Sequence, residues 1–267
     1  MKAPAFAYAK PASLAEALDL LGRPGAKVLA GGQSLIPSLN LRLSSPELLV
    51  DITGLKGYSD IEVKNGNVRI GALATHSRIE KSTVVQEHLP LLAQAVPYIA
   101  HPAIRNRGTL GGSLALADPA AEYPACAVSL NAVFVLESSK GQRRVQAEKF
   151  FKGLFETDLE PDELLVAAEF PVGKKDDRSV FLELTRRHGD YATIGLAAHN
   201  SRFVYFGAGP TPVLMKGISI GSSIQKAKEF LAKELNPTAD LYNSSATKLH
   251  LAGVLLERAW NKLSTSL

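Results

Sequence analysis

The sequence predicts an α+β protein in which antiparallel strands and helices form a larger N-terminal and a smaller C-terminal domain. The first observation is the alternation of apolar and polar residues on both sides of Asn65-Gly66, a strong hairpin signal. The second is a C-terminal third that reads as strands followed by helices. A chain of 267 residues, 46% hydrophobic and 21% charged, is also long and apolar enough to bury a core.

The first elements predicted are a helix, a strand, a glycine loop, a second helix and another strand. Ser13 followed by Glu16 forms a capping box, and apolar residues then recur with helical spacing up to Gly22. Both strands are short and apolar, and the first runs directly into a pair of glycines. The predicted strands are residues 27–30 and 48–52.

The middle of the chain is predicted to contain two hairpins and two helices. Pro119 suits the first turn of a helix, because its missing N–H is not needed there. A second hairpin is predicted to turn at residues 138–141. The elements are hairpin strands at 61–63 and 68–70, helices at 88–100 and about 119–130, hairpin strands at 132–137 and 143–147, and a strand at 164–170.

A polar segment divides the chain into two predicted domains. Residues 172–178 follow Pro171 and are mostly charged, which is typical of a linker. We therefore predict domains at residues 1–172 and 178–267. The second domain is predicted to contain strands at 180–184, 192–198 and 202–206 and helices at 223–235 and 246–263.

Charge and composition exclude several classes of function. The formal net charge of +4 comes from 30 basic and 26 acidic residues that are spread along the chain, without the basic patch that nucleic-acid binding uses. No stretch approaches the roughly 18 apolar residues of a membrane span, and the first ten residues lack the apolar centre of a secretory signal. We expect a cytoplasmic protein that has no membrane span and binds no nucleic acid.

Cysteine and histidine usage argues against a metal site on this chain. Cys126 is the only cysteine, so the chain has no internal disulfide and cannot supply the thiolates of an iron–sulfur cluster. The apolar neighbours of Cys126 favour a buried, inert thiol over a reactive one. The six histidines show no ligand spacing such as H-E-x-x-H. We predict no metal ligand and no catalytic acid or base.

Two glycine-rich segments carry the strongest functional signal. The first, Ala30-Gly31-Gly32-Gln33-Ser34-Leu35, leaves a predicted strand and enters a predicted helix. Unpaired backbone N–H groups and the positive end of a helix meet at such a place, and glycine lets the backbone approach a phosphate closely. Gln33 and Ser34 add side-chain donors. This segment is therefore a candidate anion site.

The second segment, Arg107-Gly108-Thr109-Leu110-Gly111-Gly112-Ser113, repeats this chemistry ahead of a helix predicted to carry Asp118 and Glu122 at its start. Two such segments can hold one pyrophosphate from opposite sides. The alternative is that each is a tight turn between packed elements. The usual dinucleotide and mononucleotide fingerprints are absent, and Gly207-Ala208-Gly209 runs into Pro210, which indicates a turn. A Rossmann domain is not expected.

Five segments of the chain form a recognisable set. They are residues 30–35, the run from Ile104 to Ala115, Asp118-Pro119-Ala120-Ala121-Glu122-Tyr123-Pro124, residues 186–192 and Gly207-Ala208-Gly209-Pro210-Thr211-Pro212. Together they resemble the medium, FAD-binding subunit of the molybdenum hydroxylases, the group of carbon monoxide dehydrogenase and the xanthine dehydrogenase family. The resemblance covers almost the whole chain.

The resemblance implies the p-cresol methylhydroxylase-type FAD-binding fold for the first domain, with both glycine segments at the FAD pyrophosphate. The implied contacts are Leu29, Ala30, Gly31, Gly32, Gln33, Ser34 and Leu35 in the first segment and Thr109, Leu110, Gly111, Gly112 and Ser113 in the second. Glu122, where the family often has Asp, is implied to bind the adenosine part. Tyr191 is implied to lie against the isoalloxazine ring, the alternative being a core tyrosine after a turn.

Three further positions lie near these segments. A lysine that some relatives place just before the paired arginines is matched here by Glu183 or Thr185, so no phosphate contact is expected from that position. His101 and Arg105 precede the second segment closely enough to approach the flavin or a partner's cluster. The alternative is a helix-end histidine and an exposed arginine without a function.

The resemblance implies an oxidoreductase subunit that transfers electrons. Its implied partners are a small subunit with two [2Fe-2S] clusters and a large subunit with the molybdenum cofactor, expected as a dimer of heterotrimers. This chain would take electrons from the clusters onto FAD and deliver them to an acceptor. Two alternatives remain: a stand-alone flavin reductase or oxidase of the same FAD-binding fold, and a scaffold subunit that has lost FAD.

Overall fold

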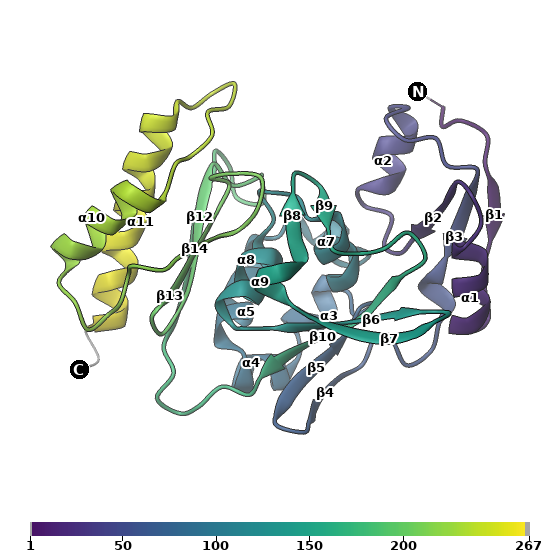
Figure 1. Ribbon diagram of the computed structural model, residues 1–267, viewed down its shortest axis with the longest axis horizontal. Coiled ribbons are helices and arrows are strands. Elements are labelled where there is room, and N and C mark those ends of the chain that lie inside the picture. The colour runs from purple at the N-terminus through teal and green to yellow at the C-terminus, as the bar shows by residue number, and fades with distance from the viewer. Residues whose placement is uncertain (1, 265–267) are drawn as a thin grey trace.

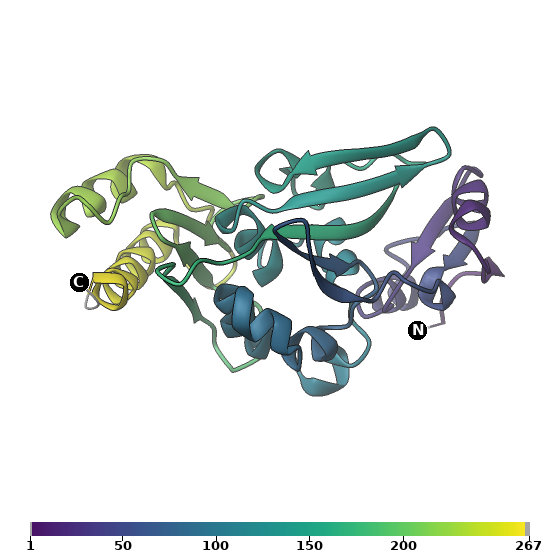
Figure 2. The same ribbon diagram turned by 90° about the horizontal axis from the view of Figure 1, so that it is seen from below.

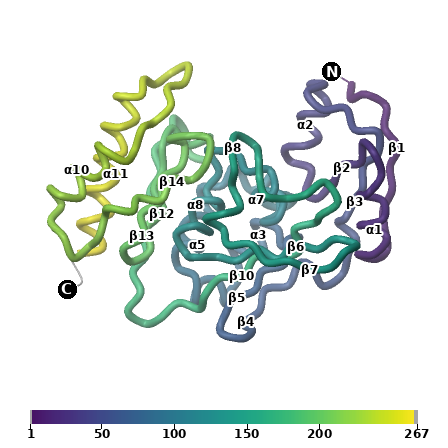
Figure 3. The backbone as a smooth tube through the Cα atoms, in the orientation of Figure 1, coloured from purple at the N-terminus to yellow at the C-terminus, as the bar shows by residue number. Residues whose placement is uncertain are grey.

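The structure, a computed structural model, describes residues 2–264 and arranges them in three groups along the longest axis of the molecule (Figure 1). A small sheet lies at the N-terminal end, a five-stranded sheet with helices in the middle, and a four-stranded sheet with two helices at the C-terminal end. The backbone trace places the first and the last described segments of the chain at opposite ends of the molecule (Figure 3). The predicted α+β class is confirmed.

Three parallel strands form the N-terminal sheet, in the order β1-β3-β2. The predicted capping box is present: the Ser13 hydroxyl accepts the N–H of Glu16, and the Glu16 carboxylate accepts the N–H of Ala12. The short strand β1 was not predicted. The elements are β1 (Ala7–Ala9), α1 (Leu14–Leu21), β2 (Ala26–Leu29), α2 (Leu35–Asn40) and β3 (Leu48–Asp51).

Five antiparallel strands form the middle sheet, in the order β4-β5-β10-β6-β7. Both predicted hairpins are confirmed. Asn65 and Gly66 have φ values of 50° and 74°, the left-handed backbone that a two-residue hairpin turn needs. The strands are β4 (Ile61–Lys64), β5 (Asn67–Gly71), β6 (Val133–Ser138), β7 (Gly141–Gln146) and β10 (Leu164–Pro171).

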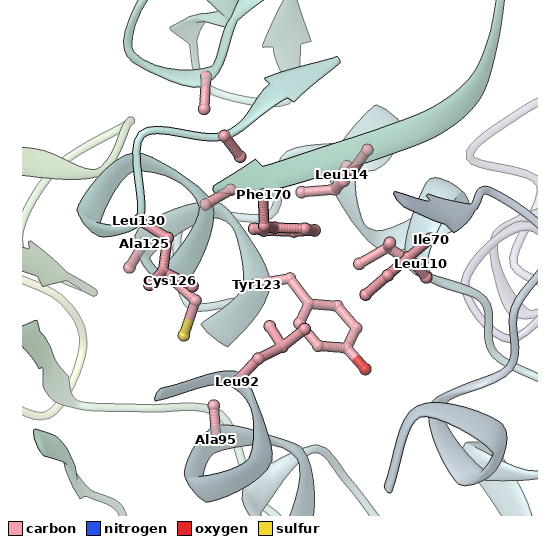
Figure 4. Close-up of a cluster of buried hydrophobic side chains, with 14 of the residues drawn as sticks. Ile70, Leu92, Ala95, Leu110, Leu114, Tyr123, Ala125, Cys126, Leu130 and Phe170 are labelled. Carbon is pink, nitrogen blue, oxygen red and sulfur yellow. The ribbon is translucent and has the colours of Figure 1, made fainter. Parts of the chain in front are cut away.

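Short helices cover one face of the middle sheet, as the view from below shows (Figure 2). They are α3 (His76–Glu80), α4 (Thr83–His88), α5 (Pro90–Ala95), the 3₁₀ turn Val96–Tyr98, α6 (Pro102–Arg105), α7 (Leu110–Leu116) and α8 (Glu122–Ser129). Their buried side chains meet those of the sheet, with the Tyr123 ring lying between Leu92 and Leu110 (Figure 4). After β7 follow α9 (Ala147–Phe150), β8 (Phe151–Gly153) and β9 (Glu156–Thr157).

Two predicted helices in this region were wrong in extent. The helix predicted at 88–100 is divided, because Pro90 is the first residue of α5 and Pro97 lies inside the 3₁₀ turn that follows it. The helix predicted from Pro119 begins only at Glu122. The Asp118 carboxylate accepts the N–H of Ala120, so the residues before α8 form a turn instead.

The C-terminal sheet is antiparallel, in the order β11-β12-β13-β14. It packs between α5 and α8 on one face and α11 on the other. The predicted strands and helices are present, and β14 was not predicted. The elements are β11 (Ser179–Leu184), β12 (Ile194–His199), β13 (Arg202–Phe206), β14 (Val213–Met215), α10 (Ile224–Glu234) and α11 (Ser245–Ser264).

Residues 172–178 contain no helix or strand, as expected of the predicted linker. One hydrophobic cluster nevertheless includes residues from both sides of this segment, with Phe134 and Phe170 before it and Phe181 and Phe206 after it. The division into domains at 1–172 and 178–267 therefore stays a prediction. No helix within residues 2–264 is both long and apolar enough to cross a membrane.

Candidate cofactor site

The two glycine-rich segments, far apart in the sequence, are in direct contact. A Cβ atom on Gly31 would lie within 2.8 Å of both the Arg107 carbonyl carbon and the Gly108 Cα, and closer still to the Arg107 carbonyl oxygen. This packing leaves no space for a side chain at Gly31. The structure thus brings together the two segments that the sequence predicted to face one site.

The first segment joins β2 to α2 and leaves several backbone donors without a protein acceptor. Gly32 has a φ of 72°, in the left-handed region that favours glycine. Among residues 2–264, no acceptor receives the four consecutive N–H groups of residues 32–35. The Gln33 side chain donates to the Gly31 carbonyl at 3.0 Å. Four neighbouring N–H groups at one turn suit a phosphate.

The second segment was predicted to be a loop ahead of a helix. It forms instead the first turn of α7. Thr109 is the N-cap residue, and its hydroxyl accepts the N–H of Gly112 at 3.1 Å. The N–H groups of Leu110 and Gly111 donate to carbonyls within residues 72–74. The backbone donors of this turn are therefore already satisfied within the protein.

The second segment can still contribute a surface and hydroxyl groups. Gly112 is exposed, and a Cβ atom there would meet only the Thr109 hydroxyl, at 2.9 Å. The half-buried Ser113 lies next to it. Free N–H groups on one segment and hydroxyls beside an uncovered glycine on the other fit a diphosphate that lies between them.

A helix that the sequence did not predict, α3, supports the second segment from behind. The His76 N–H donates to the Gly108 carbonyl at 2.9 Å, and the Gly108 Cα lies against the His76 imidazole. The Tyr123 ring packs on His76 with centroids 5.2 Å apart. Burial, aided by the charge of Arg105, lowers the pKa of His76 to about 4, so this histidine is neutral at pH 7.

The only sequence signal for α3 is its cap. The Thr75 hydroxyl accepts the N–H of Arg78, but Thr75 is followed by no helical run of apolar residues. A five-residue helix has too little pattern to be detected from the sequence.

Three acidic side chains gather where α8 begins. Glu122, the first residue of α8, is only 9% exposed, and burial raises its pKa to about 7, with a further contribution from the charge of Asp118. Both carboxylate oxygens of Glu183 are buried without a hydrogen-bond partner in residues 2–264. Burial, together with the charge of Glu122, raises the pKa of Glu183 to about 8. This pair can hold protons at neutral pH.

Tyr191 is not a core residue. Its side chain is 70% exposed, which excludes the alternative of a buried tyrosine after a turn. The turn before it depends on Gly189, which has a φ of 79°, and whose Cα packs against the Ala100 carbonyl. An exposed aromatic ring on a fixed turn is available to a ligand.

Arg105 is not the exposed arginine that was considered from the sequence. It is 9% exposed and forms an ion pair with Glu80, with Nε to Oε2 at 3.1 Å. It therefore does not reach a flavin or a partner's cluster. His101 is exposed and lies close to Gly189.

Metal-ligating side chains are dispersed in the described part of the chain. Residues 2–264 contain no group of three or more His, Cys, Asp or Glu side chains that could hold a metal ion. The predicted burial of Cys126 is confirmed, and burial raises the pKa of its thiol well above the ordinary value.

Fold and site together define a flavoprotein of the FAD-binding type, and the comparison with known proteins identifies its family. Residues 4–173 match the family described as "FAD binding domain in molybdopterin dehydrogenase". The chain belongs to the FAD-binding medium subunits of the molybdenum hydroxylases, a family of oxidoreductases. The FAD-binding fold and the family expected from the resemblance are confirmed.

Similarity extends along the whole chain. The chain is 35% identical to the 6-hydroxypseudooxynicotine dehydrogenase complex subunit alpha of Paenarthrobacter nicotinovorans, covering 98% of this chain and 95% of the relative. It is also 35% identical to the carbon monoxide dehydrogenase medium chain of Hydrogenophaga pseudoflava, covering 97% and 96%. A solved structure of carbon monoxide dehydrogenase from the same organism matches with a TM-score of 0.95, at 34% identity and 99% coverage of both chains.

Proposed function

We propose that this chain is the electron-transfer subunit of a molybdenum-containing hydroxylase or dehydrogenase, taking electrons from the [2Fe-2S] clusters of a partner subunit and passing them to an external acceptor. The observation that carries the proposal is the contact of Gly31 with Arg107. This contact joins two glycine-rich segments suited to binding a phosphate, in a chain of this family. FAD supplies the redox chemistry when it is bound, and the protein's task is to position it.

The proposed roles of the side chains follow from what each group offers. The N–H groups of residues 32–35 donate to the diphosphate, and the hydroxyls of Thr109 and Ser113 approach it from the other side. Glu122 accepts a hydrogen bond from the adenosine part, and Tyr191 covers the flavin ring. The full proposed set is Leu29, Ala30, Gly31, Gly32, Gln33, Ser34, Leu35, Thr109, Leu110, Gly111, Gly112, Ser113, Glu122 and Tyr191.

The partners follow from what this chain lacks. Its one cysteine cannot hold a [2Fe-2S] cluster, so the clusters belong to a small iron–sulfur subunit and the molybdenum cofactor to a large subunit. The names of the relatives support this, since they are a medium chain and a complex subunit. We propose a dimer of such heterotrimers in the cytoplasm.

Two other functions make different predictions. A stand-alone flavin reductase or oxidase would need its own substrate site with an acid or base beside the flavin. A scaffold subunit without FAD would have no use for the uncovered Gly112 or for four free N–H groups.

Anaerobic mixing of the purified chain with candidate substrates tests the proposal. We expect a yellow protein whose flavin absorbance is unchanged by substrate until an iron–sulfur subunit and a molybdenum subunit are added. Rapid bleaching without partners would favour the stand-alone enzyme, and a colourless chain that takes up no FAD would favour the scaffold.

A further inference from the structure

The ion pair of the buried Arg105 with the half-buried Glu80 lies behind the candidate cofactor site. The guanidinium of Arg105 meets the Glu80 carboxylate twice, with Nε to Oε2 at 3.1 Å and Nη2 to Oε1 at 3.4 Å. Paired donors and acceptors of this kind fix the orientation of a guanidinium. Glu80 ends α3, whose first residue, His76, holds Gly108.

The remaining guanidinium nitrogen of Arg105 holds a turn of backbone. Nη1 donates to the carbonyl of Ala100 at 2.9 Å and to that of Ile99 at 3.2 Å. Ala100 has a φ of 46°, a strained conformation for a residue with a side chain, so this turn needs support from its surroundings. Arg105 provides that support.

The same Ala100 carbonyl also contacts the turn that carries Tyr191. A Cβ atom on Gly189 would lie 2.9 Å from the Ala100 oxygen, so the backbones of the two turns touch. The conformation of the Gly189 turn therefore depends on where Arg105 holds Ala100.

The backbone of Arg105 leads directly into the other end of the site. Arg105 lies at the end of α6, and the carbonyl of Arg107, two residues later, is the surface against which Gly31 packs. A second bond ties this stretch to α3, because the Ser77 hydroxyl donates to the Asn106 side chain at 2.7 Å. One arginine thus connects both glycine segments with the turn of Tyr191.

We propose that Glu80 and Arg105 are positioning residues that fix the backbone at both ends of the site. The phosphate end is formed by the two glycine segments, and the flavin end by the turn that carries Tyr191. The inference rests on the proposed function in taking FAD as the ligand. The contacts of Glu80 and Arg105 do not depend on that function. Neither side chain touches the cofactor. A change in the pair should therefore alter both ends at once, which loss of a single contact would not do.

The test uses Arg105→Lys in the full chain. Lysine keeps the charge but has one nitrogen in place of the three that Arg105 uses, so it cannot reproduce the paired contact with Glu80 together with the bond to the Ala100 carbonyl. FAD affinity from a fluorescence titration reports the phosphate end. The fluorescence of bound flavin and its midpoint potential report the ring end, because both depend on the aromatic ring against the flavin. Thermal unfolding checks that each variant is folded.

Two variants serve as controls. Arg144→Lys changes another arginine–glutamate pair, with Glu169, on the middle sheet away from both segments. Gly189→Ala strains the left-handed turn that carries Tyr191 and crowds the Ala100 carbonyl, so it disturbs the ring end without changing Arg105. If Arg105→Lys does not fold, Glu80→Gln is judged by the same criteria, because it keeps the size of the side chain and removes the charge.

We expect Arg105→Lys to weaken FAD binding about tenfold and to change both flavin signals, as loss of a charge-assisted hydrogen bond would. Gly189→Ala should change the flavin signals and leave the affinity within about twofold, and Arg144→Lys should change neither. Wild-type affinity or wild-type flavin signals in folded Arg105→Lys would overturn the inference. If the unmodified chain binds no FAD, the proposed function fails instead.

Discussion

The backbone of Gly31 rests on the carbonyl group of Arg107, so that the turn after β2 and the approach to α7 form one continuous surface. Neither segment forms this surface alone. The first contributes N–H groups without acceptors, and the second contributes a capped helix turn with an uncovered glycine. The proposed cofactor site therefore depends on the contact between Gly31 and Arg107.

Gly31→Ala should disrupt this contact. The new methyl group would overlap backbone atoms of Arg107 and Gly108, which cannot move aside as a flexible side chain can. We expect the free energy of unfolding to fall by about 1–3 kcal/mol and FAD binding to weaken. Gly209→Ala is the matched control, since a Cβ atom there meets nothing within 4 Å. Equal stability and FAD affinity for the two variants would contradict the contact.

Gly112→Val should remove FAD binding and leave the chain folded. Gly112 is helical, so its substitution strains no positive φ, and the only close neighbour of the added carbon is the Thr109 hydroxyl. A branched side chain would instead cover the surface offered to the diphosphate. Flavin content of the purified variant, measured by absorbance beside its melting temperature, decides the matter. Normal flavin content in the folded variant would show that the turn at Gly112 does not contact the diphosphate.

Tyr191→Ala should keep FAD and change its redox behaviour. The exposed ring lies on a different turn from the glycine segments, so its loss should leave the phosphate anchor intact. The midpoint potential or the rate of reoxidation by oxygen should change, because stacking acts on the flavin ring. Tyr191→Phe, which keeps the ring, should behave like the unmodified chain. Unchanged redox behaviour of Tyr191→Ala would separate this residue from the flavin.

Glu183→Gln should stabilise the folded chain at alkaline pH. The pKa of Glu183 is about 8 in the folded chain against 4.5 ordinarily, so the folded state binds more protons than the unfolded state between these values. The contribution of this group to the free energy of unfolding is therefore complete below about pH 4.5 and is lost as the pH rises to about 8.

Because glutamine does not titrate, the variant should gain about 1–2 kcal/mol over the unmodified chain at pH 8 and little at pH 4.5. Denaturant unfolding at both pH values measures this difference. Glu62→Gln, on the exposed part of β4, provides the control. A gain that is the same at both pH values would show that Glu183 is not a buried acid with a raised pKa.

Local patterns in the sequence predicted most of the fold. The Ser13 capping box, the Asn65-Gly66 turn and the alternation along β6 and β7 each depend on a few adjacent residues. Such features can therefore be predicted from the local sequence alone. The elements that were missed, such as β1, α3 and β14, are three to five residues long. Elements of this length are held by tertiary contacts and have almost no pattern of their own.

The site was predictable only as a pair of anion-binding segments. The sequence could not predict that Gly111 is needed because its backbone lies against Ala72, or that the N–H groups of Leu110 and Gly111 are already used. It also could not predict that Arg105 is buried against Glu80, because ion pairs between distant residues leave no local signal. These features arise from the packing of α3 and α6 on the glycine segments.

Competition between FAD and its fragments tests most directly the claim that the two glycine segments hold the diphosphate. The FAD-free chain is titrated with FAD, with ADP and with riboflavin, and binding is followed by calorimetry. We predict that ADP binds and displaces FAD competitively, that riboflavin binds far more weakly than FAD, and that Gly112→Val loses the affinity for ADP. Riboflavin binding as tight as that of FAD, with no competition from ADP, would contradict the account.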